Sequence, residues 1–234
     1  MMELEKDIQR IDGVIANSYL LVGDDLTLID AGLPKYAATI LQAIEELGFS
    51  LEALRRILIT HADLDHVGGL SELCARTGAQ VYASAAARQR LIAGARPRPI
   101  RQGFPPMRAL VNLIRKFNRL EPFPATQITL LKPDQVLPVR GGLVVIAAPG
   151  HTLGHLAFFE RSSRTLFAGD ALTCASGHLG ISPERVSEDL LAARRTVQRF
   201  IALKPARVYC GHGELPGDQA AEELMALGSA TAMG

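Results

Sequence analysis

Potential metal ligands follow short apolar segments at four places along the chain. Five of the six histidines lie in Gly- and Asp-rich segments, and the segment at residues 61–66 reads HADLDH. Imidazole and carboxylate groups are common ligands of transition metals in proteins. We therefore expect these side chains to meet at a metal centre rather than to act as separate structural residues. The candidates are His61, Asp63, Asp65, His66, His151, Asp170 and His212.

Each ligand group follows a segment with the pattern of a strand. Residues 56–60 (RILIT) run into the first group, and residues 143–149, 165–169 and 207–211 run into the other three. Strand ends are rigid, and the loops that leave them can converge on one edge of a sheet. Glycines flank the ligands, where they permit close backbone approach. Ligands that are distant in the sequence can therefore meet in space.

The rest of the chain alternates in the same way, which is typical of an α/β protein. The pattern predicts further strands over residues 14–22, 26–29, 80–83, 128–131 and 156–160, and helices over residues 35–47, 67–77, 187–203 and 219–227. No repeat or long linker divides the chain, so we expect one domain over residues 1–234.

Residues 86–124 interrupt this alternation and are interpreted as an inserted basic lid. They hold nine Arg or Lys residues and one acid, a net charge of +8, whereas the whole chain carries +1 and the remainder therefore −7. Residues 107–120 have the pattern of a helix with one apolar face. The charge would attract anionic substrates. The apolar face would cover the active site, form a homodimer contact or lie on a membrane surface, and packing on its own domain is the plainer alternative.

In their order, the motifs resemble those of the metallo-β-lactamase superfamily. HADLDHVGG (61–69) matches the HxHxDH loop of that family, and it is followed by PGHTLGH (149–155), AGD (168–170) and CGHG (210–213). LIDAG (28–32) stands where the family has its early DxG. The resemblance spans nearly the whole chain. It implies an α/β fold of the αβ/βα four-layer sandwich type, with helices outside two facing sheets and a dinuclear metal site at one edge.

The resemblance also implies a role for each ligand. His61, Asp63 and His151 would hold a first metal, Asp65, His66 and His212 a second, and Asp170 would bridge the two. Two cations at such a site lower the pKa of a bridging water from about 15.7 towards ~7, so hydroxide is available at neutral pH. Asp65 would orient that hydroxide and is the expected catalytic residue.

Three further residues are expected to support the site. Asp30 would accept a hydrogen bond from a ligand imidazole and fix its tautomer, although an Asp before Gly also suits a turn. His155 would have a structural or supporting role behind the ligands. His178, in the segment SGHLG, is the candidate for contact with substrate, with a solvated loop histidine as the alternative.

Asp63 stands where the family motif has its second histidine. A carboxylate is a harder donor than imidazole, so we expect two divalent metals with zinc first and iron or manganese as alternatives. Flavodiiron proteins, a redox branch of the fold, also carry an acid at this position. They append a flavodoxin domain, for which we expect no room after His212.

Composition and the N-terminal sequence further limit the classes of function and the cellular location that we expect. The net charge of +1 and the few aromatic residues in the basic segment argue against nucleic-acid binding. The N-terminus lacks the pattern of a signal peptide, so we expect a cytoplasmic protein. Three widely spaced cysteines, at positions 74, 174 and 210, are expected to be reduced and mostly buried.

The expected activity is hydrolysis of a small ester, lactone, thioester or related anionic substrate by a metal-bridging hydroxide. The alternative is a di-iron redox or oxygen-binding protein of the flavodiiron-like branch without its flavodoxin domain. A non-catalytic binding module is disfavoured because the ligand set is complete apart from Asp63. A glyoxalase II is disfavoured because we expect no segment after His212 for the C-terminal helical substrate domain of that family.

Overall fold

The computed structural model describes residues 1–5, 7–11, 15–95, 98, 106, 120–214 and 219–232. The chain forms two compact units, one containing the described residues up to Arg98 together with residues 120–131, and one that includes the chain from Lys132 onwards. Apart from Leu120, the amphipathic helix expected over residues 107–120 lies outside the described residues.

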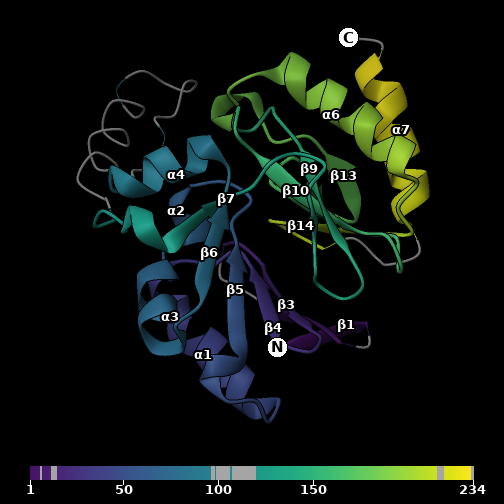
Figure 1. Cartoon of the computed structure of the whole chain (residues 1–234). Helices are drawn as coiled ribbons and strands as arrows, with labels where there is room; N and C mark the ends of the chain where they lie inside the picture. The colour runs from purple at the N-terminus through teal and green to yellow at the C-terminus, as the bar shows by residue number, and fades with distance from the viewer. Residues whose placement is uncertain are drawn as a thin grey trace. The chain divides into compact units, whose positions relative to one another are not determined.

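The first unit contains a seven-stranded sheet in sequence order (Figure 1). Its strands are antiparallel up to β4 and parallel from β4 to β7. Parallel neighbours end at the same edge of a sheet, so the loops after β4 and β5 begin side by side. The strands are β1 (Met2–Glu5), β2 (Ile8–Ile11), β3 (Ser18–Val22), β4 (Leu26–Ile29), β5 (Leu54–Leu58), β6 (Gln80–Ala83) and β7 (Ile128–Leu130).

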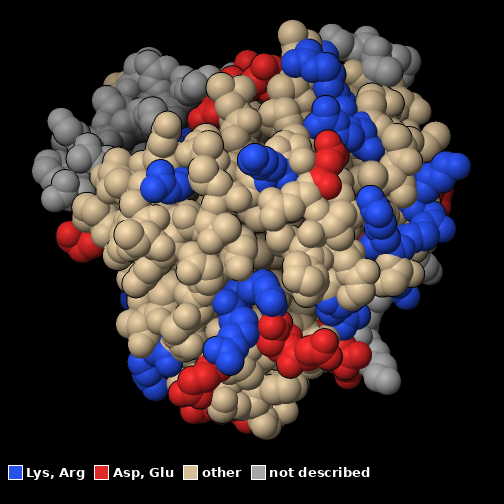
Figure 2. Space-filling model, viewed as in Figure 1, with Lys and Arg blue, Asp and Glu red and all other residues tan. Residues whose placement is uncertain are grey.

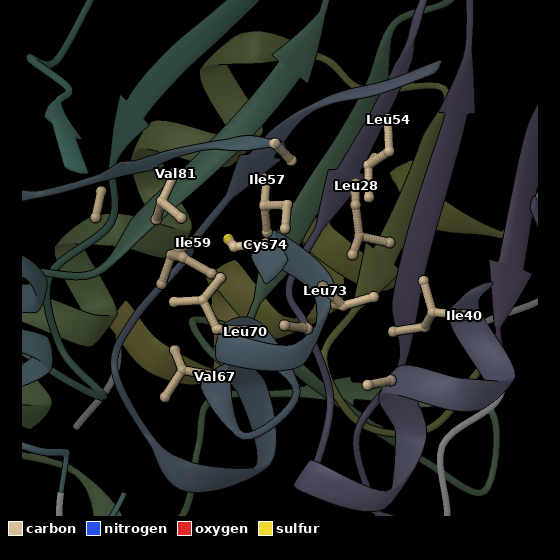
Figure 3. Packing of buried hydrophobic residues seen from close by; sticks show 14 of the residues in the cluster. Leu28, Ile40, Leu54, Ile57, Ile59, Val67, Leu70, Leu73, Cys74 and Val81 are labelled. Carbon is tan, nitrogen blue, oxygen red and sulfur yellow. The ribbon is translucent and has the colours of Figure 1, made fainter. Parts of the chain in front are cut away.

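Helices pack on one face of this sheet through a buried apolar cluster (Figure 3). Leu28, Ile57 and Val81 are paired across three neighbouring parallel strands, and each is fully buried. They belong to the same cluster as Leu73 of α3 (Leu70–Thr77) and Ile40 of α1 (Ala37–Glu46). Burying one such side chain stabilises the fold by about 1.5–3 kcal/mol. The helices of the first unit are α1 (Ala37–Glu46), α2 (Leu64–Val67), α3 (Leu70–Thr77) and α4 (Ala85–Ile92), with 3-10 turns at Pro34–Tyr36, Leu51–Ala53 and Ala125–Gln127.

The second unit contains a five-stranded sheet in the order β14-β11-β10-β9-β8. Its neighbours are antiparallel except β11 and β14, which are parallel and therefore end at one edge. A separate hairpin is formed by β12 and β13. The strands are β8 (Val136–Leu137), β9 (Leu143–Ala147), β10 (Leu156–Glu160), β11 (Thr165–Gly169), β12 (Thr173–Ala175), β13 (His178–Gly180) and β14 (Arg207–Cys210).

Helices α6 (Leu190–Leu203) and α7 (Ala220–Ala232) lie side by side in the second unit (Figure 1). Val197 and Phe200 of α6 share a buried cluster with Leu166 of β11. A 3-10 turn at Glu184–Val186 precedes α6, whose first turn is capped by the Asp189 carboxylate accepting the Ala192 N–H at 2.9 Å. Capping of this kind stabilises a helix by about 1 kcal/mol.

Most expected elements are present. The hairpin of β1 and β2, helix α4, strand β8 and the β12–β13 hairpin were not expected. The helix predicted over residues 67–77 is two helices, and at their junction the Gly69 N–H donates to the Gly32 carbonyl oxygen at 3.2 Å instead of to a carbonyl of α2. The helix predicted from Ser187 begins at Leu190, because Asp189 provides its cap.

Basic and acidic side chains are interspersed on the face of the molecule that Figure 2 shows, and several basic ones lie over α6. Among the described residues, no helix combines the length and the apolar composition that crossing a bilayer requires.

Candidate metal centre

The loop after β5 carries the first group of candidate ligands. Strand β5 continues through Ile59 and Thr60 into His61, and α2 then presents Asp65 and His66. Gly68 and Gly69 allow this loop to pack closely against its neighbour. A Cβ on Gly68 would lie 2.4 Å from the Pro34 ring, and one on Gly69 would lie 2.5 Å from the Ala31 carbonyl oxygen. Only glycine therefore lets this loop pack against the loop that follows β4.

Asp30 connects the two loops from a buried position. It directly follows β4, is 2% exposed and has a φ of +59°, a conformation that Asp and Asn tolerate better than most residues. Its Oδ1 accepts the Thr60 backbone N–H at 2.9 Å, and its Oδ2 accepts the Thr60 hydroxyl at 2.7 Å. The same Oδ2 lies 2.8 Å from Nδ1 of His66.

These bonds fix the tautomers of two histidines. Asp30 is a carboxylate and can only accept, so Nδ1 of His66 carries the proton that is donated. The Thr60 hydroxyl uses its single proton towards Asp30, so it accepts from Nδ1 of His61 at 3.0 Å. In both rings Nε2 is then the nitrogen with a lone pair, as metal coordination requires. Asp30 thus contacts His66 directly and reaches His61 through the Thr60 hydroxyl.

Asp65 and the two imidazoles lie close together in the first unit. The rings of His61 and His66 have centroids 4.2 Å apart. Asp65 lies in the first turn of α2 and is partly exposed, whereas both histidines are buried. A partly exposed carboxylate beside two buried imidazoles is suited to both metal binding and contact with solvent.

Asp63, by contrast, is held by two arginines. Nε of Arg98 donates to Oδ1 at 2.9 Å and to Oδ2 at 3.0 Å, and Nη2 donates to Oδ2 at 2.6 Å. Arg90 on α4 donates to Oδ1 at 3.3 Å. Oδ2 also lies 3.6 Å from Nε2 of His61. The contacts of these arginines with Asp63 were not predicted from the sequence. The one indication of them was the basic composition of residues 86–124.

The second unit places its three candidate ligands around one carboxylate. Asp170 follows β11, and its Oδ2 lies 3.5 Å from Nε2 of His151 and 3.1 Å from Nε2 of His212. Two ligand atoms that share one tetrahedral zinc ion at about 2.05 Å each are separated by about 3.3 Å. Oδ2 of Asp170 therefore lies within 3.5 Å of both imidazoles, close to the separation of two ligands that share one ion.

Local structure holds these three residues in place. The Asp170 backbone N–H donates to Nε2 of His155 at 3.1 Å, which fixes the backbone at Asp170. Gly150 precedes His151 with a φ of +150°, and a Cβ there would lie 2.5 Å from Cα of Ala193. The turn before His151 therefore packs directly on α6.

His178 has a different environment. It lies on β13 rather than in a loop, its side chain is 79% exposed, and its Nδ1 is 3.1 Å from Oε1 of Glu223 on α7. Glu223 also accepts the Leu179 backbone N–H at 2.9 Å. The backbone bond, followed by the His178 bond, lowers the pKa of Glu223. In the second unit His178 therefore connects the β12–β13 hairpin to α7.

The three cysteines are free and buried, as expected. Burial raises the pKa of the Cys74 thiol to about 12, and it raises the pKa of Cys174 as well. Burial, reinforced by the proximity of Cys174 and Asp170, also raises the pKa of Cys210. All three are therefore protonated at neutral pH and poor nucleophiles.

The side chains present fit divalent metal ions. His61 and His66 direct a basic Nε2 away from their fixed Nδ1, and His151 and His212 direct Nε2 at a shared carboxylate oxygen. Imidazole nitrogens and carboxylate oxygens in these proportions suit zinc, iron or manganese.

Comparison with known proteins places the chain in a family. A model of the metallo-beta-lactamase superfamily matches residues 11–212. The "Probable metallo-hydrolase YflN" of Bacillus subtilis is 27% identical over 90% of this chain and 85% of its own length. A hydroxyacylglutathione hydrolase of Cereibacter sphaeroides is 31% identical over 75% of this chain, which spans about half (54%) of that relative.

Solved structures show the same fold. A metallo-beta-lactamase from Cronobacter sakazakii, described as a HARLDQ-motif mutant, has a TM-score of 0.74 at 22% identity, covering 99% of this chain and 95% of its own. A metallo-beta-lactamase family protein from Thermus thermophilus has a TM-score of 0.73 at 22% identity, covering 99% of this chain and 81% of its own. The fold expected from the sequence is therefore confirmed. The chain belongs to the metallo-β-lactamase superfamily and is a metal-dependent hydrolase of that superfamily.

Proposed function

We propose that this hydrolase uses two divalent metal ions to cleave a small ester, lactone, thioester or related substrate that carries an anionic group. Following the family motif, the first metal is assigned to His61, Asp63 and His151. The second is assigned to Asp65, His66 and His212, and Asp170 to a bridging position. The observation that carries the proposal is the Asp30 network, because it commits both imidazoles of the loop after β5 to the tautomer that coordinates a metal.

The metal ions would supply a hydroxide nucleophile at neutral pH and polarise the oxygen of the group under attack. Asp65 is assigned to accept a hydrogen bond from that nucleophile and to orient it, since its carboxylate is partly exposed next to the buried His66. His155 keeps Asp170 in place through the Asp170 backbone N–H. Asp30 accepts the Nδ1 proton of His66, which leaves Nε2 as the nitrogen that would bind a metal.

The substrate class follows from charge. The segment 86–124 carries a net charge of +8, and Arg90 and Arg98 from this segment lie within hydrogen-bonding distance of Asp63, in the motif that holds the ligands. A cationic surface next to a metal centre raises the local concentration of anionic substrates. The hydroxyacylglutathione hydrolases among the relatives support a thioester as one member of the class to be tested.

Replacing Asp65 with Ala tests this assignment. We expect turnover to fall at least about 10²-fold, since a positioned acid–base group contributes roughly 10²–10⁴-fold, while the unfolding midpoint changes little because the side chain is partly exposed. Hydrolysis of a panel of lactones, thioesters and phosphodiesters measures the first quantity, and circular dichroism measures the second.

Asp24→Ala is the matched control, because Asp24 is an exposed carboxylate in the turn between β3 and β4. It should retain full activity. Unchanged turnover in Asp65→Ala would refute the role assigned to Asp65.

A further inference from the structure

Asp63 occupies the one ligand position at which this chain departs from the family motif, and its carboxylate is bound by two arginines. Nη2 of Arg98 donates to Oδ2 at 2.6 Å, and Nη2 of Arg90 donates to Oδ1 at 3.3 Å. The single N–H of Arg98 Nε lies between the two oxygens, at 2.9 Å from Oδ1 and 3.0 Å from Oδ2. Both oxygens of Asp63 are therefore occupied by guanidinium donors.

The Asp63 oxygen that lies near the His61 imidazole is also the one with the shortest hydrogen bond to Arg98. Oδ2 lies 3.6 Å from Nε2 of His61, so it is the atom that would share a metal with that imidazole. Its shortest bond, 2.6 Å to Nη2 of Arg98, is a charge-assisted hydrogen bond within the first unit. For Oδ2 to bind a metal, one of these N–H groups would have to be displaced.

Burial strengthens this interaction. The side chains of Arg98 and Asp63 are only 12% and 16% exposed, so solvent screens their attraction less than it screens a surface ion pair. Two guanidinium groups at the same place also raise the local positive potential, which opposes the approach of a dication. The charge beside His66 has the opposite sign, since the neighbour of this imidazole is the Asp30 carboxylate.

We infer that Asp63 is not a metal ligand but the anchor of Arg98 and Arg90, and that the first metal position consequently binds its ion much more weakly than the second. This inference rests on the proposed metal-dependent function and replaces one ligand in it. It makes Arg98 a positioning residue that sets the difference in affinity between the two metals.

Titration of chelator-treated full-length protein with Zn²⁺ tests the inference, with binding followed by calorimetry and by competition with a zinc indicator. The wild type should bind one ion tightly and a second at least about 100-fold more weakly, the equivalent of losing one or two charge-assisted bonds. In Arg98→Gln, Asp63 becomes available as a ligand, so the weaker step should tighten by about tenfold or more. The tighter step should be unchanged within about twofold in the same variant.

Arg98→Lys is the second variant, because it keeps the charge in a single ammonium group and should preserve the fold if Arg98→Gln does not. It should tighten the weaker step by less than Arg98→Gln. Arg76→Gln is the control, since it removes one positive charge from an exposed position on α3 and should leave both steps unchanged.

The outcomes separate this inference from the proposed function. Two tight, equal binding steps in the wild type would overturn the inference and leave the metal-dependent function in place. A weaker step that loses affinity or does not change in Arg98→Gln would show that Asp63 already binds the metal with the help of Arg98, which also overturns it. Failure to bind any divalent metal would overturn both.

Discussion

Replacement of Asp30 by Asn changes the hydrogen bonds that orient His66 and Thr60 in the loop after β5, while the shape of the side chain at position 30 stays nearly the same. Asn is nearly isosteric with Asp and tolerates the φ of +59° at this position. In the native network, Oδ1 faces one donor, the Thr60 backbone N–H, and Oδ2 faces two, the Thr60 hydroxyl and Nδ1 of His66. An Asn side chain must place an NH₂ group at one of these two positions.

Neither orientation satisfies the partners. With NH₂ at the Oδ2 position, it meets two donors, and His66 can respond only by moving its proton to Nε2, which abolishes metal coordination by that ring. With NH₂ at the Oδ1 position, it meets the Thr60 backbone N–H, whose role cannot change. Because the site is buried, we expect a loss of about 2–4 kcal/mol in the free energy of unfolding and a fall of about 10–100-fold in metal affinity.

Urea unfolding of the chelator-treated protein and Zn²⁺ titration measure the two effects separately. Asp25→Asn is the control, because Asp25 forms a partly exposed ion pair with Arg56 in the same unit. It should cost no more than about 1 kcal/mol and leave metal affinity unchanged. Metal affinity in Asp30→Asn within about twofold of the wild type would refute the argument that Asp30 sets the tautomer of His66.

Two further predictions concern the second unit. Gly150→Ala should destabilise the protein by about 2–4 kcal/mol in urea unfolding, because the new Cβ would lie 2.5 Å from Cα of Ala193 at a φ of +150°. The control is Gly48→Ala, at a φ of +82° with open space around it, which should cost about 1 kcal/mol. Equal losses of stability in the two variants would contradict the steric explanation. Glu223→Gln should destabilise the protein at neutral pH, because the hydrogen bond from the Leu179 backbone N–H lowers the pKa of Glu223 in the folded state. A carboxylate whose pKa is lowered in the folded state stabilises the fold at pH values above its ordinary pKa of 4.5, and this stabilisation is lost as the pH falls through the folded-state pKa. The difference in free energy of unfolding between variant and wild type should therefore shrink at acidic pH. A difference that is constant with pH would contradict this explanation.

The ligand motifs could be predicted from sequence because their positions follow a local rule. A strand that ends in Gly, His and Asp is visible in a short window, as the segment before Asp170 illustrates. The strands Gln80–Ala83 and Leu156–Glu160 have the predicted bounds because each contains a run of apolar residues, VYA and LAFF, that is visible in a short window. The hairpin of β1 and β2 was not predicted because apolar and charged residues alternate over the short segment MELE. Strand β1 pairs with β2, and β2 pairs with β3, so the hairpin is stabilised as part of the larger sheet.

The environment of Asp63 could not be predicted in the same way. Arg98 is 35 residues away from Asp63 in the sequence, so their contact is a tertiary one that no local pattern encodes. The sequence showed a basic segment and an unusual carboxylate, but nothing local indicated that one neutralises the other. His178 is a similar case, since its partner Glu223 lies 45 residues further along on α7.

Metal content measured together with hydrolysis tests the central claim most directly. The purified protein is analysed for zinc, iron and manganese, its optical spectrum is recorded, and its turnover is measured on lactones, thioesters and phosphodiesters before and after chelation. We expect bound divalent metal, hydrolysis of at least one anionic substrate, loss of that activity on chelation and its return when metal is added back. Two irons with an oxo-bridge absorption band and no hydrolytic turnover would contradict the account and favour a di-iron redox or oxygen-binding protein.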